Sequence, residues 1–167
     1  MIAVILLAGQ ALASTPDLGK SAGRCRASES GPAFIIDVTG LKDRRGKLKL
    51  ELYPANDGDF LADDNVLVAA GQAFSRVEVD TPASGPVELC IRAPGPGEYA
   101  LSLLHDRNAD RKFNLSGDGI GFSRNPKLGW SKPGVSAVRI AVGTRTIRTQ
   151  IRLNYRKGLF SVGPVKD

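Results

Sequence analysis

Residues 98–126 read EYALSLLHDRNADRKFNLSGDGIGFSRNP, and the fold prediction starts from this stretch. Its opening, residues 98–105, alternates in the manner of a β-strand, in which side chains two positions apart share a face. One face carries Tyr99, Leu101, Leu103 and His105, and the other carries Ala100, Ser102 and Leu104. A polar, glycine-rich segment follows, and an ordered loop of that length is usually functional or held by specific contacts. We therefore expect a β-domain whose functional surface is the loop from Asp106 to Asn125.

Strand patterns recur on both sides of this stretch. Residues 47–53 (KLKLELY) alternate between apolar and polar side chains, and residues 33–38 (AFIIDV), 74–79 (FSRVEV) and 87–92 (VELCIR) are rich in β-branched residues. Residues 137–142 and 146–155 predict a closing hairpin, whereas residues 66–73 fit either a strand or a short helix. No strong helix pattern and no repeat occurs. Seven to eight short strands separated by Gly/Pro turns predict an all-β protein, an antiparallel β-sandwich.

The N-terminal residues 1–13 (MIAVILLAGQALA) are uncharged and apolar, and they end in a small-x-small pattern typical of a signal-peptidase site. We expect a cleaved signal peptide here, although no Lys or Arg precedes its apolar core; the alternative is a buried N-terminal strand. The run is shorter than the roughly 20 residues of a membrane-spanning helix, so we expect no transmembrane segment in the mature chain. We expect the rest of the chain to divide into an N-terminal tail (residues 14–32), a β-sandwich domain (residues 33–156) and a C-terminal tail (residues 157–167).

The chain has two cysteines, Cys25 and Cys90. An even number of cysteines in an exported chain predicts a disulfide, which would tie the N-terminal tail to the strand over residues 87–92. The alternative is a pair of unpaired buried thiols. A zinc site made from these cysteines and His105 is not expected, because structural zinc needs four ligands at tight spacings.

The formal net charge is +6. In an exported protein this charge fits an anionic envelope glycan, lipid head groups or another envelope protein as partner, and the alternative is a solvated basic surface with no specific partner. Nucleic acid is not expected, because aromatic residues are few and no known reader motif occurs. Three arginines lie on the outward face of the strand expected over residues 146–155 or directly after it: Arg148, Arg152 and Arg156. They form a basic ladder that could bind an anion. The alternative is a solvated outer face that protects a sheet edge from aggregation.

The start of the long loop resembles a calcium-binding loop. Asp106, Asn108 and Asp110 stand at alternate positions, as in a DxDxDG motif, with Asn114 and Asp118 further on. Arg111 replaces the glycine of the sixth position, however, and Gly117 replaces the acid of the twelfth. Two interpretations stay open: the five residues bind Ca²⁺, or Asp106 and Asn108 accept hydrogen bonds from backbone amides in Asx-turns and Arg111 pairs with a carboxylate.

The single histidine, His105, is the candidate base for an exported hydrolase. Its nucleophile would be Ser102, Ser116 or Ser123. No GxSxG elbow marks any of these serines as activated. We therefore expect no catalytic residue, and instead a histidine whose hydrogen bonds hold the base of the loop. Trp130 is expected to fill the core or plug a loop, since sugar stacking would require Trp130 and Phe122 to be exposed side by side.

The residues around the loop resemble a bacterial family known as domain-of-unknown-function family 2141. The resemblance rests on the block GEYALSLLHDRNADRKFN, on GIGFSRNP and on a last strand that ends in Tyr155, and it extends over about residues 33–155. It implies an exported, transthyretin-like or immunoglobulin-like β-sandwich with no assigned activity. Within the matching block we expect His105, Phe122, Ser123 and Asn125 to support the loop.

Together these observations predict a non-catalytic binding or accessory module of the bacterial cell envelope, periplasmic or secreted. The first alternative is a calcium-stabilised adhesion or carbohydrate-binding domain. An envelope hydrolase that uses His105 is the third interpretation.

Overall fold

The computed structural model describes residues 16–159 and 161–165, so the signal peptide expected over residues 1–13 lies outside the described residues. In these ranges strands dominate, and the helices are the short α1 (Lys20–Gly23), α2 (Asp64–Ala69) and α3 (Val135–Val138). The all-β class is confirmed. The ambiguous residues 66–73 begin inside α2, which starts where the Asp63 side chain accepts a hydrogen bond from the amide of Asn65. None of the helices in the described ranges is long and apolar enough to cross a membrane.

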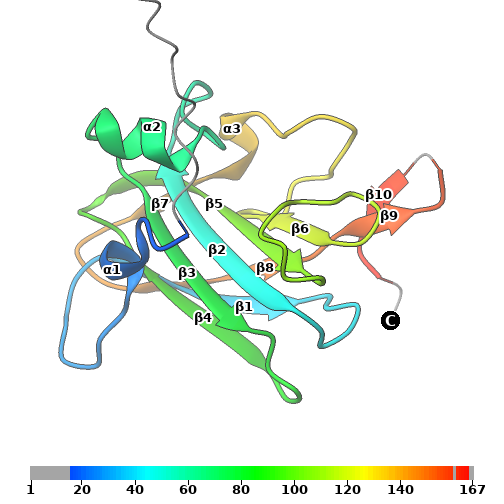
Figure 1. The fold of residues 1–167 in the computed structure, drawn as a ribbon. Coiled ribbons are helices and arrows are strands. Elements are labelled where there is room, and N and C mark those ends of the chain that lie inside the picture. Colours follow the sequence, from blue (N-terminus) through cyan, green and yellow to red (C-terminus); the bar gives the residue numbers. More distant parts are fainter. Residues whose placement is uncertain (1–15, 160, 166–167) are drawn as a thin grey trace, which may run out of the picture.

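The strands form three sheets (Figure 1). The first has the order β4-β1-β8 and comprises β4 (Val87–Arg92), β1 (Ala33–Thr39) and β8 (Ile147–Arg152). The second has the order β3-β2-β5-β6, with β7 also paired to β5; it comprises β3 (Ser75–Asp80), β2 (Lys47–Pro54), β5 (Gly97–Asp106), β6 (Gly119–Phe122) and β7 (Arg139–Val142). The third is the small pair β9 (Tyr155–Lys157) and β10 (Ser161–Gly163).

The prediction of a closing hairpin is wrong. β7 pairs antiparallel with β5, placing Tyr99 opposite Ile140, whereas β8 pairs in parallel with β1, placing Val38 opposite Ile151. The chain therefore leaves one sheet and enters another between these strands, and one strand pair is parallel. Local alternation identifies a strand and its faces, but it carries no information about which neighbour the strand joins.

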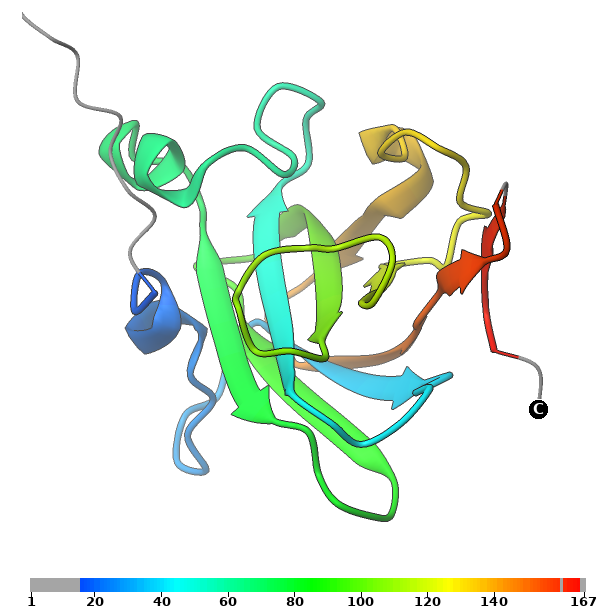
Figure 2. The same ribbon diagram turned by 45° about the vertical axis from the view of Figure 1, so that its right-hand side comes forward.

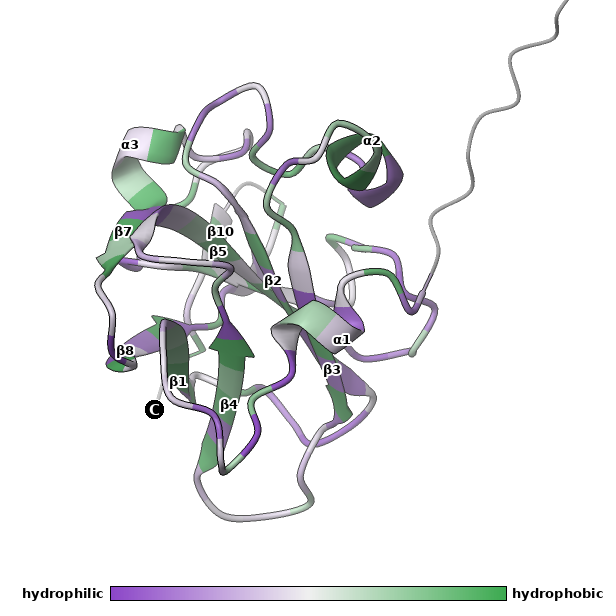
Figure 3. Cartoon of the chain, turned by 90° about the vertical axis from the view of Figure 1, so that its left-hand side faces the viewer, coloured by the Kyte–Doolittle hydropathy of each residue, from purple (hydrophilic) through white to green (hydrophobic). Residues whose placement is uncertain are grey.

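The main hydrophobic core contains side chains from both larger sheets. Figure 3 shows hydrophobic residues concentrated along the strands. The alternation of residues 47–53 predicts correctly that Leu48, Leu50 and Leu52 face the core, because side chains two positions apart share a face of a strand. Glu51, on the polar face of this alternation, is buried as well, because the other face of β2 is also covered. The fully buried members of this cluster on β1, β2 and β4 are Phe34, Ile36, Leu48, Leu50, Leu52 and Ile91.

A second cluster covers the opposite face of β2 and β5. Tyr53 and Ala100 on these strands pack with Phe60, Leu67 of α2 and Val138 of α3, and partly buried side chains close the edges. Because both faces of β5 are covered, every residue of this strand from its third position to its end is buried. The strand ends at the base of the long loop and holds that base in the interior.

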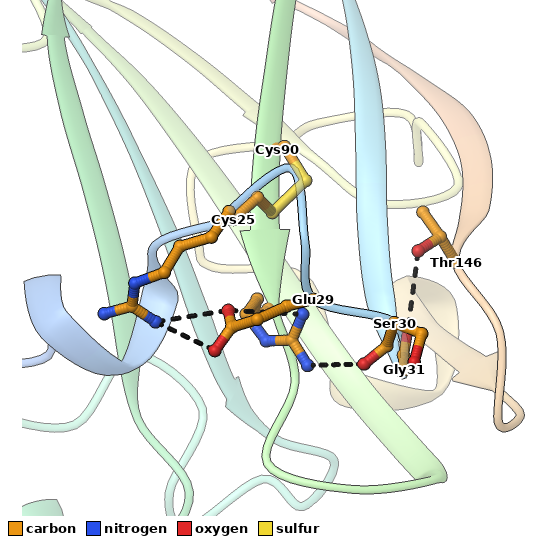
Figure 4. The surroundings of a disulfide bond; sticks show 8 residues. Cys25, Glu29, Ser30, Gly31, Cys90 and Thr146 are labelled. Carbon is orange, nitrogen blue, oxygen red and sulfur yellow. Dashed lines mark hydrogen bonds and ion pairs between the residues drawn. A yellow bond between two sulfur atoms is a disulfide. The ribbon is translucent and has the colours of Figure 1, made fainter.

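The disulfide between Cys25 and Cys90 is present, with a Cα–Cα distance of 6.0 Å. It fastens the segment that precedes β1 to the edge strand β4 (Figure 4). Arg24 also forms a β-bridge with Ile91 there. The Arg92 guanidinium donates to the carbonyl of residue 30 at 3.2 Å, which holds the same segment further along. The expected cysteine pairing is thus confirmed, and such a bond is typical of an oxidising compartment.

Candidate functional site

His105 lies at the end of β5 and is fully buried. Its Nε2 lies 2.8 Å from the carbonyl of Arg45, and its Nδ1 lies 2.7 Å from the hydroxyl of Tyr155. Because a carbonyl only accepts, Nε2 carries the proton and Nδ1 accepts from the tyrosine. Burial lowers the pKa of His105, so the neutral ring is favoured. Both ring nitrogens are satisfied, as expected for a histidine with a supporting role.

The loop over residues 107–118 connects β5 to β6 (Figure 2). It is organised by the carboxylates of Asp106 and Asp118 at its two ends. Asp106 accepts from the amides of Asp110 and Arg111 at 3.2 and 2.7 Å. Asp118 accepts from the amides of Arg107 and Asn114 at 3.0 and 2.8 Å. Both carboxylates are buried, and an unpaired amide in such a place is costly, so these bonds fix the path of the loop.

Three of the five residues expected as calcium ligands lie close together. Asp106, Asp110 and Asp118 offer oxygens that lie within 4.8 Å of one another. The Asn108 amide donates to Asp110 at 2.8 Å, and the Asn114 side chain accepts from the amide of residue 116 at 3.0 Å. Asn108 and Asn114 thus accept from the amides two positions later, as in Asx-turns, whereas Asp106 accepts from amides four and five positions later. Calcium binding stays a prediction.

The Arg107 side chain connects the loop to the turn before β2. Its guanidinium contacts Asp43 through two nitrogens and donates to the Gly117 carbonyl at 2.8 Å. The hydrogen bond from Arg107 is the main reason that the pKa of Asp43 is lowered. Arg111 lies 3.8 Å from Glu78, which agrees with the expectation that it pairs with a carboxylate.

The three serines considered as nucleophiles have other surroundings. Ser123 is buried, accepts from the Leu101 amide at 3.1 Å and donates to the carbonyl of Val138. Ser116 donates to the side chain of residue 114 at 2.6 Å, and Ser102 lies on the opposite face of β5 from the histidine. No serine therefore occurs among the hydrogen-bond partners described for the imidazole.

Phe122 and Asn125, also expected to support the loop, have partners outside it. Phe122 is buried, with its ring centroid 5.8 Å from that of Phe60. Asn125 accepts from the Arg152 amide at 2.6 Å and donates to the Gln150 carbonyl at 3.0 Å, so its amide group pairs with the backbone of β8. This side chain joins the segment after β6 to the other sheet.

The arginine ladder is not a row of free cations. Arg148 lies 2.6 Å from Asp37 on the adjacent strand β1 and 2.7 Å from Glu88 on β4, the next strand of the same sheet. Arg156 donates to the carbonyl of residue 158 at 2.9 Å. Arg148 is thus already neutralised, and an anion site that includes Arg152 and Arg156 stays a prediction.

A pocket of about 330 Å³ lies beside the long loop. Its floor is the face of β2, β5 and β6, and its walls come from the loop, which crosses in front of β2 and β5 in Figure 2, and from residues 128–133. Trp130 at the mouth is 62% exposed, so it does not fill the core. The apolar side chains at the walls and mouth are Leu61, Phe113, Leu115, Leu128 and Trp130.

A charged cluster lies at the floor of this pocket. Glu51 accepts from Arg76 at 2.8 Å and from the hydroxyl of Tyr53 at 2.8 Å, and Lys49 lies 3.3 Å from it. Arg76 also contacts Asp64 at 2.8 Å. Burial raises the pKa of Tyr53 well above its ordinary value, so its hydroxyl stays a donor.

Sequence reasoning missed this pocket because its parts come from distant segments. Phe113 interrupts a polar loop, and Trp130 lies in a Gly/Pro-rich segment. These isolated aromatic residues were the only sign in the sequence that could have indicated the pocket. Their convergence depends on how residues 107–118 and 128–133 cross the sheet, which no local pattern specifies.

The comparisons with known proteins identify a family but no activity. A sequence model described as "Uncharacterized protein conserved in bacteria (DUF2141)" matches residues 36–150. No curated protein and no solved structure matches the chain.

Proposed function

This chain belongs to the bacterial family described as uncharacterized protein conserved in bacteria (DUF2141), and we propose that it is a non-catalytic binding or accessory module of the cell envelope. The segment from Asp106 to Asn125, expected as one loop but containing β6 after the loop over residues 107–118, presents the binding surface. The disulfide between Cys25 and Cys90 supports export to an oxidising compartment, periplasmic or secreted. A sandwich of the two larger sheets is the scaffold that we propose for this loop.

The pocket carries the proposal. It is concave and largely apolar, with a few polar groups at its floor, which is the usual character of a small-molecule site. The loop that walls it is held by the buried carboxylates of Asp106 and Asp118, so the wall is preorganised.

A titration with the neutral apolar dye Nile red tests this proposal. We expect saturable binding with enhanced dye fluorescence, and a weaker affinity in Phe113→Ala, because Phe113 lines the pocket and is 48% exposed. Val68→Ala is the matched control, since Val68 is 43% exposed on α2 and lies outside the pocket. Equal binding by both variants, or no binding by the natural chain, contradicts the proposal.

The alternative is a calcium-stabilised adhesion or carbohydrate-binding domain. The observation that favours it is the approach of Asp106, Asp110 and Asp118 to within 4.8 Å. Calcium should then raise the melting temperature and EDTA should lower it. An unchanged melting temperature in both conditions would exclude this alternative.

A further inference from the structure

We propose that the pocket takes an amphipathic molecule with one short apolar chain and an anionic head group. This inference rests on the proposed function of the pocket as a binding site, and it names the ligand class.

The apolar side chains at the pocket walls favour a ligand with an apolar chain. Trp130 and Phe113 are 62% and 48% exposed at the mouth, and a chain lying between them would remove their surface from water. The volume of about 330 Å³ is near the lower end of ordinary ligand pockets, which span about 300–1,000 Å³. One short chain therefore fits better than a large ring system.

Leu61 adds apolar surface at the mouth of the pocket. It has a φ of 63°, in the left-handed region that non-glycine residues rarely adopt, and its side chain lines the pocket while remaining 37% exposed. The strained conformation keeps an apolar side chain at the mouth.

The charged residues at the pocket floor favour an anionic head group. The charged residues that line the pocket are Lys49, Glu51 and Lys132. Both oxygens of Glu51 are engaged, one by Arg76 and the other by Tyr53. Lys132 donates to the carbonyls of residues 57 and 60 at 3.2 and 2.9 Å.

Of the three charged residues that line the pocket, Lys49 is the one that we expect to contact the head group of a ligand. Its ammonium has three donors, and its described ion pair is with Glu51 at 3.3 Å. Glu78, opposite Lys49 on β3, is shared with Lys20 at 3.5 Å and Arg111 at 3.8 Å. The floor thus offers N–H donors with positive charge, which complement a carboxylate or phosphate.

Three probes with the same chain test the head group: octanoate, octanol and octylamine. Trp130 is the only tryptophan of the chain, so its fluorescence reports the pocket directly. We expect a blue shift that saturates with each probe that binds, and an affinity for octanoate about tenfold or more above that for octylamine. Phe113→Ala should weaken binding of octanoate and octanol alike.

Lys49→Gln should remove the preference for octanoate, whereas Lys47→Gln should keep it. Lys47 lies on the same strand but pairs with Asp80 at 2.6 Å, outside the pocket. If Lys49→Gln does not fold, the salt dependence of the natural chain replaces it: added salt should weaken octanoate binding and leave octanol binding unchanged.

Vesicles of phosphatidylglycerol distinguish a membrane lipid from a free amphipath. Binding to vesicles in competition with octanoate identifies the lipid source, and octanoate binding without vesicle binding identifies the free molecule. Equal affinity for all three probes, or no response of Trp130, overturns the inference. If the inference about the head group fails but Nile red still binds, the proposed function of the pocket stands. If Nile red does not bind either, both the inference and the proposed function are overturned.

Discussion

The Nδ1 atom of His105 lies 2.7 Å from the hydroxyl of Tyr155, a residue 50 positions later in the chain. This hydrogen bond joins the end of β5 to β9, next to the start of the long loop. The Tyr155 hydroxyl also accepts from the amide of Lys42 at 3.2 Å. A single tyrosine thus satisfies a buried imidazole and a turn amide.

Tyr155→Phe should lower the free energy of unfolding by about 1–3 kcal/mol, because it leaves the buried Nδ1 without a donor. Urea unfolding measures the change. Tyr99→Phe is the control: the Tyr99 hydroxyl donates to the Gly95 carbonyl in a turn, so its loss should cost less. Equal losses in the two variants would contradict the role of the His105 contact.

Acid should destabilise the protein below about pH 6.5, where an unfolded histidine becomes protonated. Burial lowers the folded pKa of His105, so in this range the unfolded state binds more protons than the folded state. The stability contribution is present above the unfolded pKa and is lost as the pH falls toward the folded one. Chemical unfolding between about pH 5 and pH 8 measures it.

His105→Gln should flatten this pH dependence, since the chain has one histidine. An equally steep dependence in the variant would assign the effect to other groups. Asp43, whose pKa is lowered mainly by its hydrogen bond with Arg107, contributes only at more acidic pH.

Asp118→Asn should loosen the long loop and cost about 1–3 kcal/mol of stability, because an amide nitrogen would face the N–H of Arg107 or Asn114. Amide hydrogen exchange over residues 107–118 should become faster. Asp110→Asn is the control, since Asp110 is exposed and its loss should cost about 0.5 kcal/mol or less. Unchanged exchange in Asp118→Asn would refute the role of this carboxylate.

Replacing both cysteines, Cys25→Ser with Cys90→Ser, should lower the free energy of unfolding by about 4 kcal/mol, because the disulfide closes a loop with a sequence separation of 65. Urea unfolding of the variant and the natural chain measures it. Thr146→Val removes the hydrogen bond to the Gly31 carbonyl and should cost less than about 1 kcal/mol. Similar values for the two changes would show that the disulfide adds little.

Most of the strands, the core-facing side of β2, the disulfide partners and the start of the long loop could be predicted along the chain. These features depend on local alternation, on turn residues and on a count of two cysteines. The local patterns indicate neither β6, which lies inside the stretch expected as a loop, nor β10. The sheet partners of β7 and β8 and the convergence of Phe113 and Trp130 around one pocket emerge only in three dimensions. Contacts between distant segments depend on how the whole core packs, so no short stretch encodes them.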